Sequence, residues 1–266
     1  MLKQNLIVGG TYGFGKEIAL FLLNRDEKVA TVSRSSSANL YTRHSTTFDN
    51  NHQHIKYDIL KSNDLTSLHE RLSNVTRHLD TLVITPALPQ LDSTSLLSNE
   101  GIEYFRTMIE LNFWSQLKLL TALLPLLKKS TNPMVLFFTS TAGWSNNIGW
   151  GQYNISKSLL NSLIFNLGAE TEQWEKKIKI FGINPWEAKT KMNSASNISS
   201  SHIIPAFSAL LKEGENYASG TIFTPDGNTH TFLEQNTNSP NLFSLYNSRN
   251  YDKLEYVREK YIINCS

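Results

Sequence analysis

The sequence has a single cysteine and no block of like charges, and both absences exclude classes of protein. Cys265 is the one cysteine among 266 residues, so neither a disulfide framework nor a thiolate metal site is expected. Lys and Arg number 25 against 23 Asp and Glu, a net charge of +2. Nucleic-acid binding requires clustered cations that neutralise phosphates. We therefore expect no metal, no nucleic-acid partner, and a reducing, cytoplasmic environment.

Long hydrophobic runs are also absent. The apolar N-terminal segment is broken by the pair Gly9-Gly10, too early for the hydrophobic core of a signal peptide. The longest apolar stretch, 111–127, is interrupted by Lys118 and Pro125, which is typical of a buried helix rather than a membrane span. No membrane partner is expected.

Short apolar runs alternate with longer segments of helical periodicity, and 40% of the residues are hydrophobic. The runs predict strands at 5–8, 29–33, 54–57, 81–84, 134–139, 178–183 and 221–224, and helices at 14–24, 65–75, 102–128, 153–174 and 203–212. This alternation predicts one α/β domain, residues 1–230, with a doubly wound, Rossmann-type parallel sheet of about seven strands and helices on both faces. The Ser- and Asn-rich segment 193–201 is typical of a mobile loop. Residues 231–266 are interpreted as a C-terminal extension containing a polar helix at 251–261.

A glycine-rich turn joins the first expected strand to the first expected helix. Residues 8–15 read Val-Gly-Gly-Thr-Tyr-Gly-Phe-Gly. Glycines permit a tight turn and let the backbone approach a pyrophosphate, while the helix N-terminus offers N–H groups and a partial positive charge. A plain flexible turn is the simpler interpretation, but the position between a strand and a helix favours a dinucleotide site.

The second expected strand ends at Ser33-Arg34. NAD-binding sites usually carry an acidic residue here that binds the ribose 2′-hydroxyl, and none is present. A guanidinium is suited to a 2′-phosphate instead. An arginine at a strand end is also common on protein surfaces, so this position alone leaves both interpretations open.

Tyr153 and Lys157 are four residues apart on an expected helix and therefore share one face. An ammonium close to a phenol favours the phenolate, and we expect the pKa of Tyr153 to fall from about 10 to about 7. A tyrosine of this kind donates or accepts a proton near neutral pH. The same spacing also arises by chance.

These three features occur in the order found in the short-chain dehydrogenase/reductase family, and the chain resembles its shorter, carbonyl-reductase-like members from residue 4 to about residue 230. The resemblance implies an NADP(H)-dependent oxidoreductase that interconverts a carbonyl and an alcohol. It makes Tyr153 the general acid or base, with Lys157 lowering its pKa. It also implies that Ser140 holds the substrate oxygen and that Asn112 supports a proton relay.

The resemblance further implies a cofactor site and a substrate site. The implied cofactor contacts are Gly9, Thr11, Tyr12, Gly13, Phe14, Gly15, Ser33, Arg34, Asp58, Ile59, Pro86, Tyr153, Lys157, Pro185 and Thr190. Trp144, Trp150 and Trp186 are expected to border the substrate. Their mixture with the Asn146-Asn147 pair suits a polar ring, such as a keto-sugar or a heteroaromatic ketone. A homodimer or homotetramer is also implied.

Two segments depart from the family's sequence. Ile84-Thr85-Pro86-Ala87 stands where Asn-Asn-Ala-Gly normally ends the fourth strand, and Trp186 replaces the glycine that follows Pro185. A non-catalytic NADP(H)-binding regulator or scaffold is therefore the alternative, although that function predicts loss of catalytic residues and none is lost. A sugar-nucleotide epimerase or dehydratase needs a larger C-terminal domain than the residues after Gly227 provide.

Overall fold

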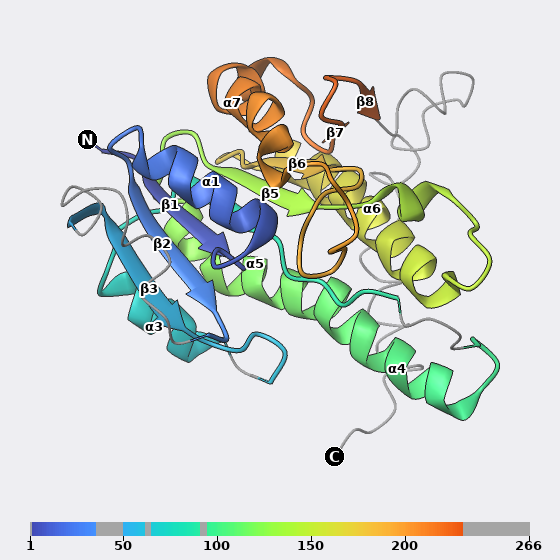
Figure 1. Ribbon diagram of the computed structural model, residues 1–266. Helices are drawn as coiled ribbons and strands as arrows, with labels where there is room; N and C mark the ends of the chain where they lie inside the picture. The colour runs from blue at the N-terminus through green and yellow to red at the C-terminus, as the bar shows by residue number, and fades with distance from the viewer. Residues whose placement is uncertain (1, 36–49, 62–64, 91–94, 231–266) are drawn as a thin grey trace, which may run out of the picture. The chain divides into compact units, whose positions relative to one another are not determined.

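A parallel sheet forms the centre of the computed structural model, which describes residues 2–35, 50–61, 65–90 and 95–230. Within these residues the strands are β1 (Gln4–Val8), β2 (Lys28–Ser33), β3 (His52–Lys56), β4 (Thr81–Ile84), β5 (Met134–Phe138), β6 (Lys179–Ile183), β7 (Ile222–Phe223) and β8 (Thr229–His230). They form one sheet in the order β3-β2-β1-β4-β5-β6-β7-β8, in which only β8 is antiparallel to its neighbour (Figure 1).

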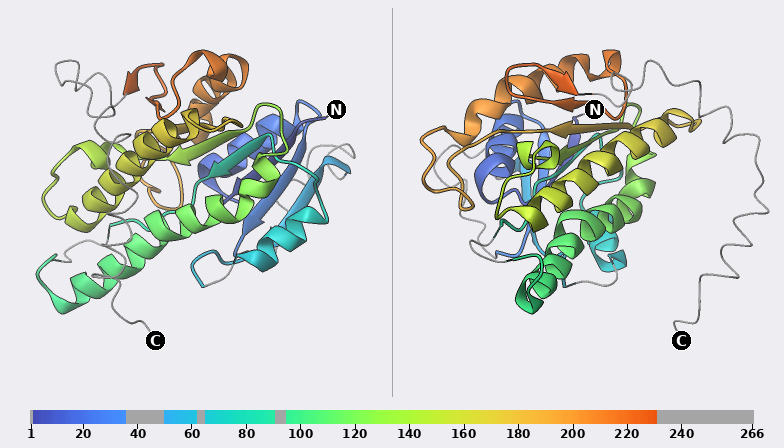
Figure 2. Two further views of the ribbon diagram at one scale, coloured as in Figure 1. Left: turned by 180° about the vertical axis from the view of Figure 1, so that it is seen from behind. Right: turned by 90° about the vertical axis from the view of Figure 1, so that its right-hand side faces the viewer.

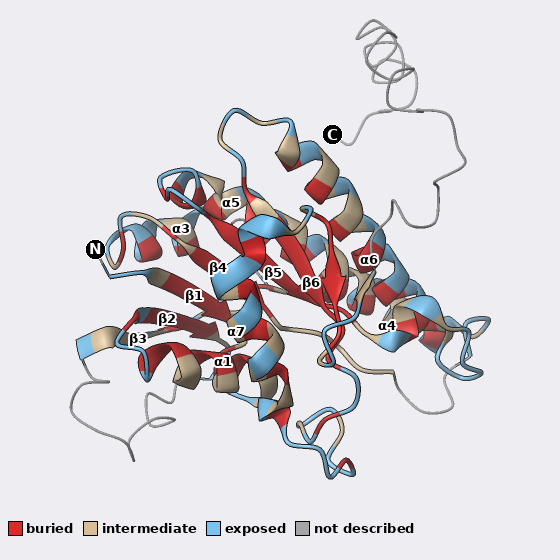
Figure 3. Cartoon of the chain, turned by 90° about the horizontal axis from the view of Figure 1, so that it is seen from above, coloured by how far each residue is buried: buried red, intermediate tan, exposed pale blue. Residues whose placement is uncertain are grey.

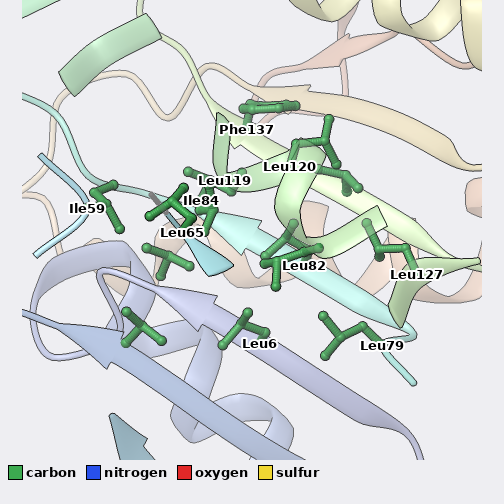
Figure 4. Packing of buried hydrophobic residues seen from close by; sticks show 14 of the residues in the cluster. Leu6, Ile59, Leu65, Leu79, Leu82, Ile84, Leu119, Leu120, Leu127 and Phe137 are labelled. Carbon is green, nitrogen blue, oxygen red and sulfur yellow. The ribbon is translucent and has the colours of Figure 1, made fainter. Parts of the chain in front are cut away.

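Helices cover both faces of the sheet because successive strand residues point to opposite sides. Leu6 and Val8 of β1 pack with α3 (Thr66–Ser73), α5 (Ser115–Leu127) and α6 (Gly151–Glu172). Ile7, between them, packs with α1 (Gly13–Leu23) and α7 (Ile204–Glu213). Figure 2 shows the two helical layers, and Figure 3 shows the buried strands between them. Figure 4 shows the apolar side chains that pack around Leu6. The predicted doubly wound α/β fold is confirmed.

The helix predicted over 102–128 is divided into three parts. It consists of α4 (Asn99–Ile109), a π-helical turn η1 (Glu110–Trp114) and α5. Ser98 begins α4, since its Oγ accepts a hydrogen bond from the Gly101 N–H at 3.0 Å. A π-helical turn inserts an extra residue into the helix and often marks a functional site. Here it contains Asn112, which is fully buried.

The other differences from the predicted elements are small. The bounds of the helices and strands shift by a few residues, and β8 was not predicted. Short 3-10 turns η2 (Thr141–Trp144), η3 (Ser200–Ile203) and η4 (Gly214–Asn216) lie between the larger elements. Among the residues described, no helix combines the length and apolar character needed to cross a membrane. The extension 231–266, its boundary and its expected helix lie outside the described residues.

The strand order changes direction between β1 and β4. From β1 the chain proceeds to β2 and β3 on one side of the sheet and returns to β4 on the other. Open parallel sheets bind ligands at the carboxyl ends of their strands beside such a switch point. The glycine turn follows β1, and Ser140 follows β5, so both lie at this edge.

Candidate active site

Ser140, Tyr153 and Lys157 form one cluster. Ser140 follows β5, and its Oγ accepts a hydrogen bond from the Ala142 N–H at 3.2 Å. Tyr153 and Lys157 lie in the first two turns of α6, and both are buried. The Ser140 hydroxyl lies near enough to the Tyr153 phenol to lower its pKa. Lys157 Nζ lies 5.6 Å from the centre of the Tyr153 ring and donates to the Phe138 carbonyl at 2.9 Å.

Burial controls the acidity of both titratable groups. It raises the pKa of Tyr153 to about 12, and the nearby Ser140 hydroxyl only partly offsets this effect. It also lowers the pKa of Lys157 to about 7. The sequence-based expectation of a Tyr153 pKa near 7 is therefore wrong for this structure. The i,i+4 spacing does bring the ammonium beside the phenol, but desolvation of the charged forms dominates at both groups.

Asn112 connects three segments of the chain. Its Nδ2 donates to the Leu88 carbonyl at 3.2 Å and to Ser156 Oγ at 3.1 Å, and its Oδ1 accepts the Leu88 N–H at 2.7 Å. Both amide hydrogens are thus used within the protein. The side chain fastens the loop after β4 to α6, directly behind the Tyr153 turn.

The unusual 84–87 segment has its own hydrogen bonds. The N–H and the Oγ1 of Thr85 both donate to the Val8 carbonyl at 3.0 Å. Gln116, on α5, donates from Nε2 to the Pro86 carbonyl at 3.0 Å. A methyl group at Gly9 would collide with Thr85 Oγ1, so the glycine permits this close contact. Thr85 therefore ties β4 to β1 at the switch point.

The glycine turn has the shape of a phosphate cradle. Gly9 and Gly13 have φ angles of +85° and +51°, in the left-handed region that favours glycine. A Cβ atom on Gly15 would lie 2.7 Å from the Gly9 carbonyl oxygen. The first turn of α1 contains no acidic residue, and its N–H groups have no partner within the helix. These residues fit the diphosphate of a dinucleotide.

Two of the predicted cofactor contacts around this turn face inward. Thr11 is buried, and the ring of Phe14 stacks on Phe138 with 5.3 Å between ring centres. Tyr12 is exposed and lies beneath Lys191, whose Nζ is 3.5 Å from the ring centre. Phe14 can therefore contribute its backbone, whereas Tyr12 also presents its side chain.

Arg34 and Asp58 follow the neighbouring strands β2 and β3. Arg34 is exposed beyond the end of β2, beside Ser33, whose Oγ lies 2.9 Å from Ser35 Oγ. Asp58 Oδ1 accepts the Leu60 N–H at 3.1 Å, while Ile59 packs into the core. The end of β2 thus presents a cation and hydroxyls, with no carboxylate among residues 33–35.

The loop after β6 approaches the glycine turn, as Figure 1 shows in front of the sheet. A Cβ atom on Gly13 would lie 3.2 Å from Thr190 Cγ2, which places the threonine against the start of α1. Thr190 Oγ1 accepts the N–H groups of Met192 and Asn193, each at 3.2 Å. The Ser- and Asn-rich loop predicted as mobile also has hydrogen bonds within itself. Pro185 precedes it and accepts a hydrogen bond from His202 at 2.6 Å.

The three predicted substrate tryptophans have different surroundings. The ring of Trp150 meets the Tyr153 ring edge-to-face, with 6.0 Å between centres. Trp144 instead packs on Phe165, three turns further along α6. Trp186 has a φ angle of +55°, the left-handed conformation that the family's glycine adopts freely. Of the three, Trp150 is the one in ring contact with a catalytic candidate.

Gln90 was not predicted from the sequence. Its Oε1 accepts the Tyr153 N–H at 3.1 Å, and its Nε2 donates to Gln152 Oε1 at 2.9 Å. The contact joins residues more than 60 positions apart, so no local spacing could have indicated it. Gln90 holds the first turn of α6 against the loop after β4.

Comparison with known proteins agrees with this geometry. A carbonyl reductase family member 4 of Xenopus laevis is 23% identical, with 73% of this chain and 79% of the relative covered. A benzil reductase ((S)-benzoin forming) of Saccharomyces cerevisiae is 26% identical, with 72% and 74% covered. A short chain dehydrogenase of Shigella flexneri, solved in complex with NADP, has the same fold: its TM-score is 0.74 at 21% identity, with 84% of this chain and 97% of that chain covered.

The family model of the short chain dehydrogenases matches residues 3–200. That span includes the glycine turn, Asn112, Ser140, the Tyr153–Lys157 pair and Thr190. The chain therefore belongs to the short-chain dehydrogenase/reductase family of oxidoreductases, which use a nicotinamide cofactor.

Proposed function

We propose that this chain is an NADP(H)-dependent reductase that converts a carbonyl group to an alcohol. The observation that carries this proposal is the buried Tyr153 phenol, which lies beside Ser140 and Lys157 at the carboxyl edge of the sheet. Because burial raises the pKa of Tyr153 to about 12, the phenol is protonated at neutral pH. A protonated phenol is the form that donates to a developing alkoxide, so Tyr153 has the protonation state that reduction requires.

The proton steps follow from the positions of the side chains. Ser140 holds the carbonyl oxygen by a hydrogen bond, and Tyr153 donates its proton to that oxygen. Bound NADPH supplies the hydride. Lys157, whose pKa is lowered to about 7, exchanges protons near neutral pH and returns one to Tyr153. The Asn112 side-chain amide donates both of its hydrogens to other protein groups. We therefore assign its role in the proton relay to its main-chain carbonyl, which lies in the π-helical turn.

The cofactor assignment rests on two features of the described residues. The diphosphate would bind at the N-terminus of α1, against the backbone of Gly9, Gly13 and Gly15. Arg34 provides a guanidinium for a ribose 2′-phosphate where an acid would bind the NAD ribose. The NADP complex of the Shigella flexneri relative supports this choice. The substrate contacts of the tryptophans, the cytoplasmic location and the homo-oligomer stay predictions.

The experiment is a screen for NADPH oxidation with ketones, diketones, quinones and keto-sugars, followed by pH profiles in both directions. Tyr153 stays protonated between about pH 6 and about pH 8, so we expect any fall in kcat/KM for reduction near about pH 7 to come from deprotonation of Lys157. Oxidation of the product alcohol requires the phenolate, so its rate should rise with pH beyond about pH 9. Binding of NADPH without turnover of any carbonyl would favour the non-catalytic alternative.

A further inference from the structure

Exposed apolar side chains are concentrated around the reactive edge of the sheet. Among the described residues, 14 large apolar side chains are exposed, and seven of them lie in three short segments. We call these seven the apolar rim: two at 96–97, two at 148–150 and three at 186–198. Solvent exposure of such side chains forfeits their hydrophobic stabilisation, so a concentration of them indicates a binding surface.

The three segments belong to the loops that follow β4, β5 and β6. These strands are parallel neighbours, so their carboxyl ends meet at one edge of the sheet, where Ser140 and Tyr153 also lie. Direct contacts connect the rim with the catalytic helix. Trp150 meets the Tyr153 ring at 6.0 Å, and Leu96 fills the space beside Gly151, the first residue of α6. Trp150 and Leu96 therefore connect the rim to the catalytic turn.

Two of the rim residues have energetically unfavourable positions in the structure. Ile148 is 100% exposed at the tip of a turn closed by a 3.1 Å hydrogen bond from the Trp150 N–H to the Asn147 carbonyl, with Gly149 at φ +81°. Trp186 is 45% exposed and adopts a left-handed backbone conformation that is strained for a residue with a side chain. Strain of this kind is maintained where a side chain serves a ligand.

We propose, on the basis of the proposed function, that the substrate is an aryl ketone whose aromatic group binds on the apolar rim. Trp150 supplies a planar face beside Tyr153, and Trp186 supplies a second on the loop after β6. Offset stacking and edge contacts with such rings select flat aromatic groups. The carbonyl then meets Ser140 and Tyr153. The aryl group is an alternative to the polar ring expected from Asn146 and Asn147, because the rim residues that contact the catalytic turn are apolar.

The test compares 1-phenyl-1,2-propanedione with 2,3-butanedione, which share the dicarbonyl group and differ in the aryl ring. Binding of both to the NADPH complex is measured by calorimetry, and kcat/KM is measured where turnover occurs. We expect the phenyl compound to bind at least about tenfold more tightly, and Trp150→Ala to remove most of that preference. Trp150→Phe should restore it.

Trp114→Ala is the matched control, since Trp114 is 47% exposed but packs on Phe113 in η1. It should leave the preference unchanged. Equal affinity for the two diketones would contradict the inference, as would a Trp150→Ala protein that weakens both equally. A phenyl preference without any turnover would uphold the aryl site and overturn the proposed reductase function instead.

Discussion

The acidity of Tyr153 and Lys157 depends on their depth in the protein more than on their mutual distance. Spacing in the sequence correctly predicts that the two side chains share a helix face. It gives no measure of how completely Phe138, Ser140 and the surrounding core exclude water from them. Burial lowers the pKa of Lys157 to about 7 and raises that of Tyr153 to about 12, so both neutral forms are favoured. The residue types were predictable, whereas their protonation states required the fold.

The predicted preference for NADPH over NADH depends on Arg34. Its charge at the end of β2 should favour NADPH over NADH by about tenfold or more, since a charge-assisted bidentate contact contributes about 1.5–3 kcal/mol. Arg34→Asp should reverse the preference, because a carboxylate repels the 2′-phosphate and binds the ribose hydroxyl. Dissociation constants of both nucleotides, measured by fluorescence titration, check this result.

The matched control for this charge change is Arg106→Asp, at an exposed arginine of α4. It should leave the ratio of the two dissociation constants unchanged. Equal affinity of the unmodified protein for NADPH and NADH would remove the role given to Arg34.

At the scale of elements, the π-helical turn and α5 hold the loop after β4. Asn112 makes three hydrogen bonds, two of them to Leu88, and Gln116 makes one to Pro86. Gln116 thus fastens the 84–87 segment that departs from the family's sequence, and Asn112 fastens the residue that follows it. The sequence predicted a continuous helix over 102–128, because periodicity over so long a segment does not reveal one inserted residue. Nor could it show that Gln90 fixes the start of α6.

The two amides give a graded prediction of stability. Asn112→Ala leaves the N–H and carbonyl of Leu88 without their partner and should lower the free energy of unfolding by about 2–3 kcal/mol. Gln116→Ala removes one hydrogen bond and should lower it by about 1 kcal/mol. Urea unfolding of the cofactor-free proteins measures both values. Equal losses for the two variants would show that Asn112 does not anchor this loop.

At the scale of the whole molecule, the alternation of strands and helices was sufficient to predict the parallel sheet and its two helical layers. The switch point between β1 and β4 then brings the glycine turn, Thr85 and the β5 loop to one edge. The apolar rim could not be predicted from the sequence, because it combines loops separated by dozens of residues and depends on which side chains stay exposed. The role of residues 231–266 stays a prediction, since they lie outside the described residues.

The central claim is that Tyr153 donates the proton in an NADPH-dependent carbonyl reduction. Tyr153→Phe keeps the ring and its contact with Trp150 but removes the hydroxyl that meets Ser140. The direct measurement is the single-turnover rate of NADPH oxidation with the best ketone, together with the NADPH dissociation constant of the same variant. We predict a loss of about a hundredfold or more in rate, with affinity for NADPH nearly unchanged. A variant that keeps a rate within about tenfold of the unmodified protein would contradict this role for Tyr153.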